Sequence, residues 1–156
     1  MKTASLKALK TELGRIHPAR LAELCIQLSK YKKENKELLT YLLFDAFDEK
    51  AYIEEVKTMT DDLFKEVNKS NSYLAKKTIR KILATVNKQI KFSGSKQTEV
   101  ELLLHFCHKL RKSGVPLFTN SALGNLYQRQ LVKIDKALAT LHEDLQYDYA
   151  DMRLLL

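Results

Sequence analysis

Hydrophobic residues recur every three or four positions along nearly the whole chain, with polar residues between them. This spacing places apolar side chains on one side of an α-helix, whereas a half-buried strand would need strict alternation. The pairs Asn-Gly and Asp-Gly, which are typical of tight hairpins, do not occur. The pattern therefore predicts an all-α protein, with helices over about residues 6–13, 18–31, 38–47, 49–67, 73–92, 98–112 and 121–145.

Several residues at the expected helix ends have the chemistry of caps. Pro18 suits a first helical position, where its missing N–H is not needed. Asp48 is a good N-cap, and Thr98 followed three residues later by Glu101 has the pattern of a capping box. Gly14 is expected to end the first helix in a left-handed conformation.

Three apolar groups are expected to be buried. The cluster from Leu38 to Phe47 predicts a short, deeply buried third helix. Cys25 and Cys107 each lie among leucines and are interpreted as reduced core residues, with a disulfide between them as the less favoured alternative. The last long helix has an apolar seam that we expect to be core or, less often, a dimer interface. That seam consists of Tyr127, Leu131, Ile134, Leu138, Leu141 and Leu145.

The composition favours one helical domain. Only four of the 156 residues are glycine and two are proline, too few for the many turns of a sheet protein. We expect about seven helices, and their short connections should place neighbours antiparallel. Two arrangements stay open, because no motif recurs at a fixed period: stacked hairpins like those of HEAT or armadillo repeats, and an irregular bundle. The predicted domain covers residues 1–156.

Two short patterns carry a family resemblance. The first is the run Leu6-Lys7-Ala8-Leu9-Lys10, continued by Leu21, Leu28 and Leu42, and the second is Ala75-Lys76-Lys77-Thr78-Ile79. Over about the first 110 residues the chain resembles a family of small, all-helical bacterial proteins to which no activity is assigned. The resemblance implies an intracellular helical protein and brings no catalytic residue.

No run approaches the ~18 consecutive apolar residues that a membrane-spanning helix needs. The first 14 residues alternate lysine with leucine and lack the apolar region of a secretion signal. We therefore expect a cytoplasmic protein that does not insert into membranes.

The formal net charge of +8 is concentrated in one fifth of the chain. From Val67 to Thr98 there are eight basic residues and no acidic one, so the rest of the chain holds 19 of each sign. The preceding segment, Asp45 to Glu66, carries eight acidic residues against three lysines. This asymmetry predicts an electrically lopsided molecule that attracts a polyanion.

The helix over residues 73–92 has its charges on one side. On a helical wheel the six basic residues fill an arc of about 140° opposite the apolar stripe. We call this set the basic face; it consists of Lys76, Lys77, Arg80, Lys81, Lys88 and Lys91. It suits an acidic protein or the phosphates of a nucleic acid, bound without sequence preference because lysine predominates. The alternatives are an ordinary solvated surface and attraction to the acidic helix before it.

A second hypothesis is a metal-dependent helical enzyme. Glu101, His105 and His108 fall at i, i+4 and i+7, on one side of a helix, and imidazole and carboxylate groups suit zinc or iron. Such a site needs further ligands, for which His142 and Glu143 are candidates. The pattern of established helical metal sites is missing, and the sequence has no nucleophile elbow and no phosphate loop. We therefore favour a non-enzymatic binding or scaffold module without a cofactor.

Overall fold

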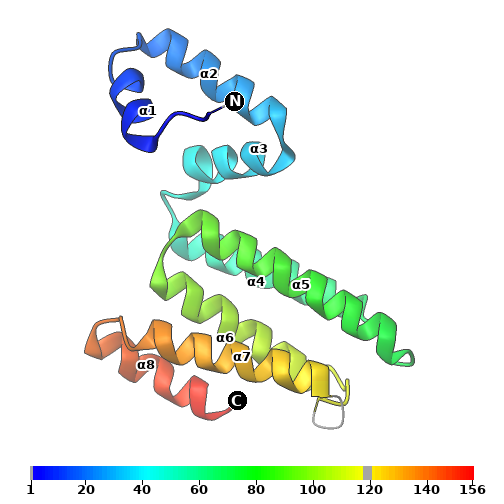
Figure 1. Ribbon diagram of the computed structural model, residues 1–156. Coiled ribbons are helices and arrows are strands. Elements are labelled where there is room, and N and C mark those ends of the chain that lie inside the picture. The colour runs from blue at the N-terminus through cyan, green and yellow to red at the C-terminus, as the bar shows by residue number, and fades with distance from the viewer. Residues whose placement is uncertain (1, 118–120) are drawn as a thin grey trace. The chain divides into compact units, whose positions relative to one another are not determined.

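The computed structural model describes residues 2–117 and 121–156, and this part of the chain is helical without a strand. It contains eight α-helices and one short π-helical segment, and helices make up 79% of the structure (Figure 1). The prediction of an all-α fold of the helical-bundle class is confirmed, with one helix more than the expected seven. None of the described helices is long and apolar enough to cross a bilayer.

Contacts divide the chain into two compact units, residues 1–44 and residues 45–156. The first unit contains α1 (Leu6–Leu13), α2 (Pro18–Tyr31) and α3 (Lys33–Thr40), of which α2 and α3 pack against each other. Pro18 opens α2, as predicted. The single domain over residues 1–156 stays a prediction.

The expected burial of residues 38–47 is wrong. The helix begins earlier, at Lys33, and its end passes into a π-helical segment, η1 (Tyr41–Asp45). In that stretch Tyr41 is buried, but Phe44 is 73% exposed and Phe47 is 84% exposed. Helical spacing shows which side of a segment is apolar, and only a packing partner makes that side buried. Cys25 is exposed for the same reason, which corrects its assignment to the core.

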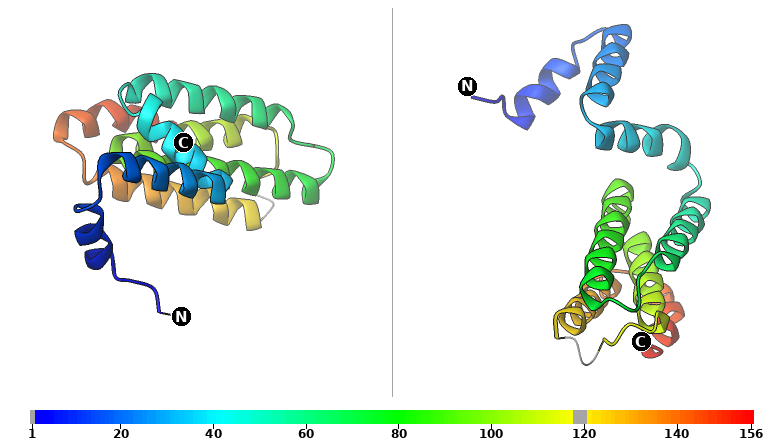
Figure 2. Two further views of the ribbon diagram at one scale, coloured as in Figure 1. Left: turned by 90° about the horizontal axis from the view of Figure 1, so that it is seen from above. Right: turned by 90° about the vertical axis from the view of Figure 1, so that its right-hand side faces the viewer.

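The second unit is built around α6 (Lys96–Lys112). This helix packs against α4 (Glu49–Lys65), α5 (Ser72–Ser93) and α7 (Ser121–Leu138), and α8 (Glu143–Leu154) follows α7. The right-hand view of Figure 2 shows α5 and α7 on one side of α6, with α4 and α8 on the other. The second unit therefore has two sides, one formed by α5 and α7 and the other by α4 and α8 (Figure 2).

The core of this unit lies where α4, α5 and α7 meet α6. Phe106 and Cys107 of α6 are fully buried, and the Phe64 ring of α4 lies 5.6 Å from that of Phe106. Cys107 is free and buried, as predicted, and burial raises the pKa of its thiol to about 12. The largest fully buried side chains elsewhere include Ile79, Ile82, Val86, Leu123 and Ile134.

The helix ends agree with the sequence in part. Asp48 caps α4, because its side chain accepts a hydrogen bond from the Ala51 amide at 3.0 Å. The expected capping box at Thr98 and Glu101 is wrong, since α6 begins at Lys96 and Ser95 is its N-cap. The Ser95 hydroxyl accepts from the Thr98 amide at 3.3 Å.

Glycine ends only some of these helices in the left-handed conformation. Gly94 adopts a φ of 67° after α5, where a side chain would be strained. Gly14 has a φ of −68° and stays right-handed, so the left-handed cap predicted for α1 is wrong.

The long helix expected over residues 121–145 is two helices. α7 ends at Leu138, and α8 begins after His142, whose ring nitrogen Nδ1 accepts from the Asp144 amide at 3.4 Å. The predicted apolar seam is therefore divided between two helices. Tyr127 and Ile134 are buried in α7, whereas Leu141 lies in the turn and Leu145 in α8. The tail folds back, and the Tyr127 hydroxyl donates to the main-chain oxygen of Leu156 at 2.7 Å.

Candidate polyanion-binding surface

α5 presents the basic face because its other side is the core. The 22-residue helix starts after Asn71, whose side chain accepts from the Leu74 amide at 3.0 Å, and it ends at Gly94. Its buried residues fall on one side, which leaves the opposite side to solvent. They are Ala75, Ile79, Ile82, Val86 and Ile90.

The structure brings the six predicted residues together along the exposed side of α5. Lys77, Arg80, Lys81 and Lys91 are exposed, while Lys76 and Lys88 are half-buried. From position 76 to position 91 the helix rises by about 22 Å at 1.5 Å per residue. Within the described chain, all of these residues except Lys88 lack an ion-pair partner.

Two of the acidic residues of α4, Asp61 and Asp62, pair with lysines outside α5. Asp62 pairs with Lys65 of the same helix at 2.7 Å, and Asp61 pairs with Lys109 of α6 at 2.7 Å. Toward α5, the Tyr52 hydroxyl donates to Gln89 Oε1 at 2.7 Å, and the Glu49 carboxylate accepts from the Ser93 hydroxyl rather than from a residue of the basic face. The five unpaired cations of the basic face are therefore not neutralised by the helix that precedes them.

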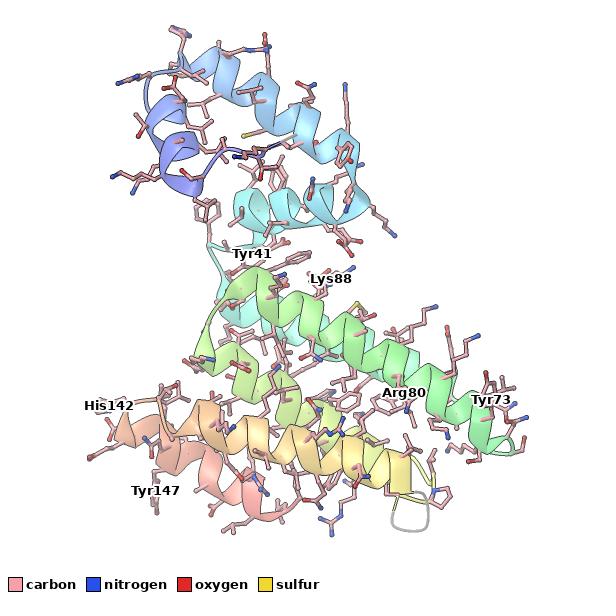
Figure 3. The ribbon with its side chains drawn as sticks, viewed as in Figure 1. Tyr41, Tyr73, Arg80, Lys88, His142 and Tyr147 are labelled. Atoms are coloured by element: carbon pink, nitrogen blue, oxygen red, sulfur yellow. The ribbon has the colours of Figure 1, made fainter. Side chains whose placement is uncertain are left out.

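Packing adds an arginine that the sequence reasoning missed. A pocket of about 380 Å³ lies between α5 and α7, with Arg80 on one wall and Arg129 on the other. Leu83 and Leu126 supply apolar lining, and Arg129 is exposed and unpaired within the described residues. Figure 3 shows Arg80 on the side of α5 that faces α7.

One signal could have drawn attention to α7. Arg129, Lys133 and Lys136 fall at i, i+4 and i+7, the spacing of one helix side. Lys133 lies 2.8 Å from Asn87 Oδ1 of α5 and 3.4 Å from Glu99 Oε1 of α6, so it belongs to the packing between these helices. The side formed by α5 and α7 carries nine basic residues and one acidic residue, against four and nine on α4 and α8.

The three residues of the metal hypothesis line one pocket, but two of them already have partners. Glu101 accepts from Lys57 Nζ at 3.0 Å and from the Tyr149 hydroxyl at 2.7 Å. His105 Nε2 lies 2.6 Å from Asp61 Oδ1. In residues 2–117 and 121–156, no group of three or more His, Cys, Asp or Glu side chains is arranged to hold a metal ion.

The further ligands that the hypothesis needs lie elsewhere. His142 is the N-cap of α8 at an exposed turn, where Figure 3 shows it at the far end of α7, and it does not line the pocket of Glu101 and His105. Glu143, the first residue of α8, is exposed as well.

Comparison with family models, with curated proteins and with solved structures gives no match for this chain. The resemblance of its first 110 residues to small helical bacterial proteins accordingly stays a prediction.

Proposed function

We propose that this protein is a non-enzymatic binding module whose basic face holds a polyanion, with the phosphate backbone of a nucleic acid as its partner. One observation carries the proposal. Five cations of the basic face, and Arg129 across the α5–α7 pocket, have no ion-pair partner among the described residues. A cytoplasmic location belongs to the proposal.

Counterion release is the physical basis for this binding. Each phosphate that a lysine or arginine neutralises frees condensed cations from the nucleic acid, which favours binding at low salt and weakens it as salt rises. Arg80 and Arg129 can each donate two hydrogen bonds to one phosphate, whereas the lysines act as point charges.

The surface favours backbone contact over recognition of bases. Lysine outnumbers arginine five to one on the basic face, so bidentate reading of guanine has few donors. The aromatic residues of α5, Tyr73 and Phe92, lie near its two ends and form no continuous stacking platform. We therefore expect similar affinity for different sequences.

Fluorescence anisotropy with labelled DNA and RNA, single- and double-stranded, tests the proposal. The informative variant replaces Lys77, Lys81 and Lys91 by Gln, because all three side chains are exposed and their loss leaves the core intact. We expect its affinity at low salt to fall by about tenfold or more, which corresponds to 1.4 kcal/mol.

The matched control replaces Lys7, Lys10 and Lys30 by Gln. These lysines are equally exposed and lie in α1 and α2, so the variant has the same net charge as the first one. Equal binding by both variants and the unchanged protein would contradict the proposal. A protein that binds no nucleic acid at low salt but binds an acidic protein domain would also contradict the proposal. That result would assign the basic face to an acidic protein partner.

A further inference from the structure

A second pocket lies on the opposite side of α6, between α4, α6 and α8. Its volume is about 490 Å³, within the usual range for sites of small ligands. Much of its lining is apolar, from Leu104 of α6 and from Met152, Leu155 and Leu156 at the end of the chain. Met152 is 49% exposed and Leu155 is 71% exposed, so a ligand in the pocket would cover apolar surface that now faces water.

Most polar groups around this pocket are already engaged with one another. Lys57 bridges Glu54 and Glu101, at 2.7 Å and 3.0 Å. Burial lowers the pKa of Lys57, but the hydrogen bonds and negative charges of the two glutamates together raise it above its ordinary value. The Tyr149 hydroxyl donates to Glu101, and burial together with this bond raises the pKa of Tyr149 to about 12. Asp61 is shared by His105 and Lys109, so the acidic groups have little capacity left for a ligand.

His108 is the exception. It is half-buried, it lines the pocket, and within the described residues it has no hydrogen-bond partner. It also lines an adjoining hollow of about 540 Å³ between α4 and α6, together with Lys109 and Lys112. Lys112 is exposed and has no ion-pair partner in the described chain.

The surroundings of His108 are electropositive. Burial lowers its pKa, and so do the positive charges of four neighbours on its own helix. These neighbours are Lys112, His105, Lys109 and Arg111.

The other elements around the two hollows add few free negative charges. The titratable groups that they contribute are Lys57, Asp61, Asp62 and Lys65 of α4, Lys69 from the loop after α4, and Tyr149 of α8. The two carboxylates among them are paired, Asp61 with His105 and Lys109, and Asp62 with Lys65. An anionic group beside His108 would therefore find cations and a free imidazole.

We propose that this pocket binds a small organic anion with an apolar chain, a carboxylate of the medium-chain fatty acid type. The carboxylate lies at His108 and Lys112, where the two hollows meet, and the chain lies against Leu104, Met152 and Leu155. Burial of the chain supplies most of the affinity, at roughly 25 cal/mol per Å² of apolar surface removed from water. The site is separate from the basic face, and it stands whether or not α5 binds a nucleic acid.

Calorimetric titration with decanoate, at concentrations below micelle formation, tests this site. Two probes separate its halves: propionate keeps the carboxylate without the chain, and decanol keeps the chain without the charge. We expect decanoate to bind at least about tenfold more tightly than either. Equal affinity for decanoate and decanol, or for decanoate and propionate, would overturn the proposal.

Variants then locate the ligand. Met152→Glu places a charge in the apolar wall and should weaken decanoate binding by about tenfold or more, whereas the neighbouring Leu154→Glu should leave it unchanged. Leu154 is the matched control because it is 81% exposed and does not line the pocket. Lys112→Gln should weaken binding by about threefold to tenfold, with Lys136→Gln on α7 as its control. Identical losses in the pocket variants and their controls would contradict the assignment.

The pKa of the His108 imidazole distinguishes binding at this site from non-specific hydrophobic binding, which would leave it unchanged. An anion bound at His108 favours the protonated ring, so saturation with decanoate should raise the His108 pKa, followed by its NMR titration. The NMR signals of His17 and His142, which lie outside the pocket, should not respond to decanoate. An unchanged His108 pKa at saturating decanoate would place the carboxylate elsewhere and overturn the proposal.

Discussion

The two sides of the second unit use their charges in different ways. On the side of α4, α6 and α8, acidic groups such as Asp61 and Glu101 each contact two partners across helix boundaries. On the side of α5 and α7, five cations of the basic face and Arg129 have no such partner within the described chain. Charges of the first kind hold helices together, and charges of the second kind are available to another molecule. Substitutions on the two sides should therefore have separable effects.

The largest effect should come from α6, which both sides share. Phe106→Ala removes a fully buried ring that contacts Phe64, and it should lower the free energy of unfolding by about 3–5 kcal/mol. Urea denaturation followed by circular dichroism measures this loss. A loss below about 1 kcal/mol would mean that α6 is not the common core of the two sides.

A smaller loss should follow when the paired side is broken. Glu101→Ala leaves Lys57 and the Tyr149 hydroxyl without their shared acceptor, which should cost about 1–3 kcal/mol of stability. Gln97 remains as a donor to Tyr149 at 3.0 Å, so the hydroxyl keeps one bond. The same urea measurement applies, and a neutral result would show that these partly exposed contacts do not hold α4 and α8 on α6.

The paired side should also respond to acid. Burial raises the pKa of Asp61, but the hydrogen bonds and the positive charges of Lys109 and His105 together outweigh it and hold this pKa below its ordinary value. Because the folded pKa lies below the unfolded one, Asp61 stabilises the fold above the unfolded value, and the contribution is lost as pH falls through the folded pKa. In Asp61→Asn, the free energy of unfolding should change less with pH between neutral and acid conditions than it does in the unchanged protein. Parallel profiles for the variant and the unchanged protein would contradict this account.

Substitutions on the basic face should have the smallest effect on the free energy of unfolding. Lys81→Gln removes an exposed, unpaired cation, so the free energy of unfolding should change by less than about 0.5 kcal/mol. A loss above about 1 kcal/mol would mean that the basic face stabilises the fold, and the distinction between the two sides would fail.

Features that depend on helical periodicity and on local caps could be predicted from the sequence. The six residues of the basic face lie where the wheel places them, because the buried residues of α5 fix the opposite side. The cap at Asp48 followed from local chemistry alone. These features depend on residues a few positions apart, which a sequence shows directly.

Features that depend on packing were out of reach. The apolar spacing through Phe44 and Phe47 shows an apolar side, but only a neighbouring helix decides burial, and both rings are exposed. The seam of α7 keeps its spacing past Leu138, although the chain turns there and His142 starts a new helix. Arg129 reaches the pocket of Arg80 only because α5 and α7 pack on the same side of α6.

The salt dependence of nucleic-acid binding tests the central claim most directly. The unchanged protein should bind duplex DNA with log Kobs falling linearly in log salt, with a slope of about −3 to −6. Replacing Lys77, Lys81 and Lys91 by Gln should reduce the steepness by about 0.9 for each phosphate that is no longer neutralised, while the Lys7, Lys10 and Lys30 control keeps the original slope. The same slope in both variants would contradict the claim that the basic face follows a phosphate backbone.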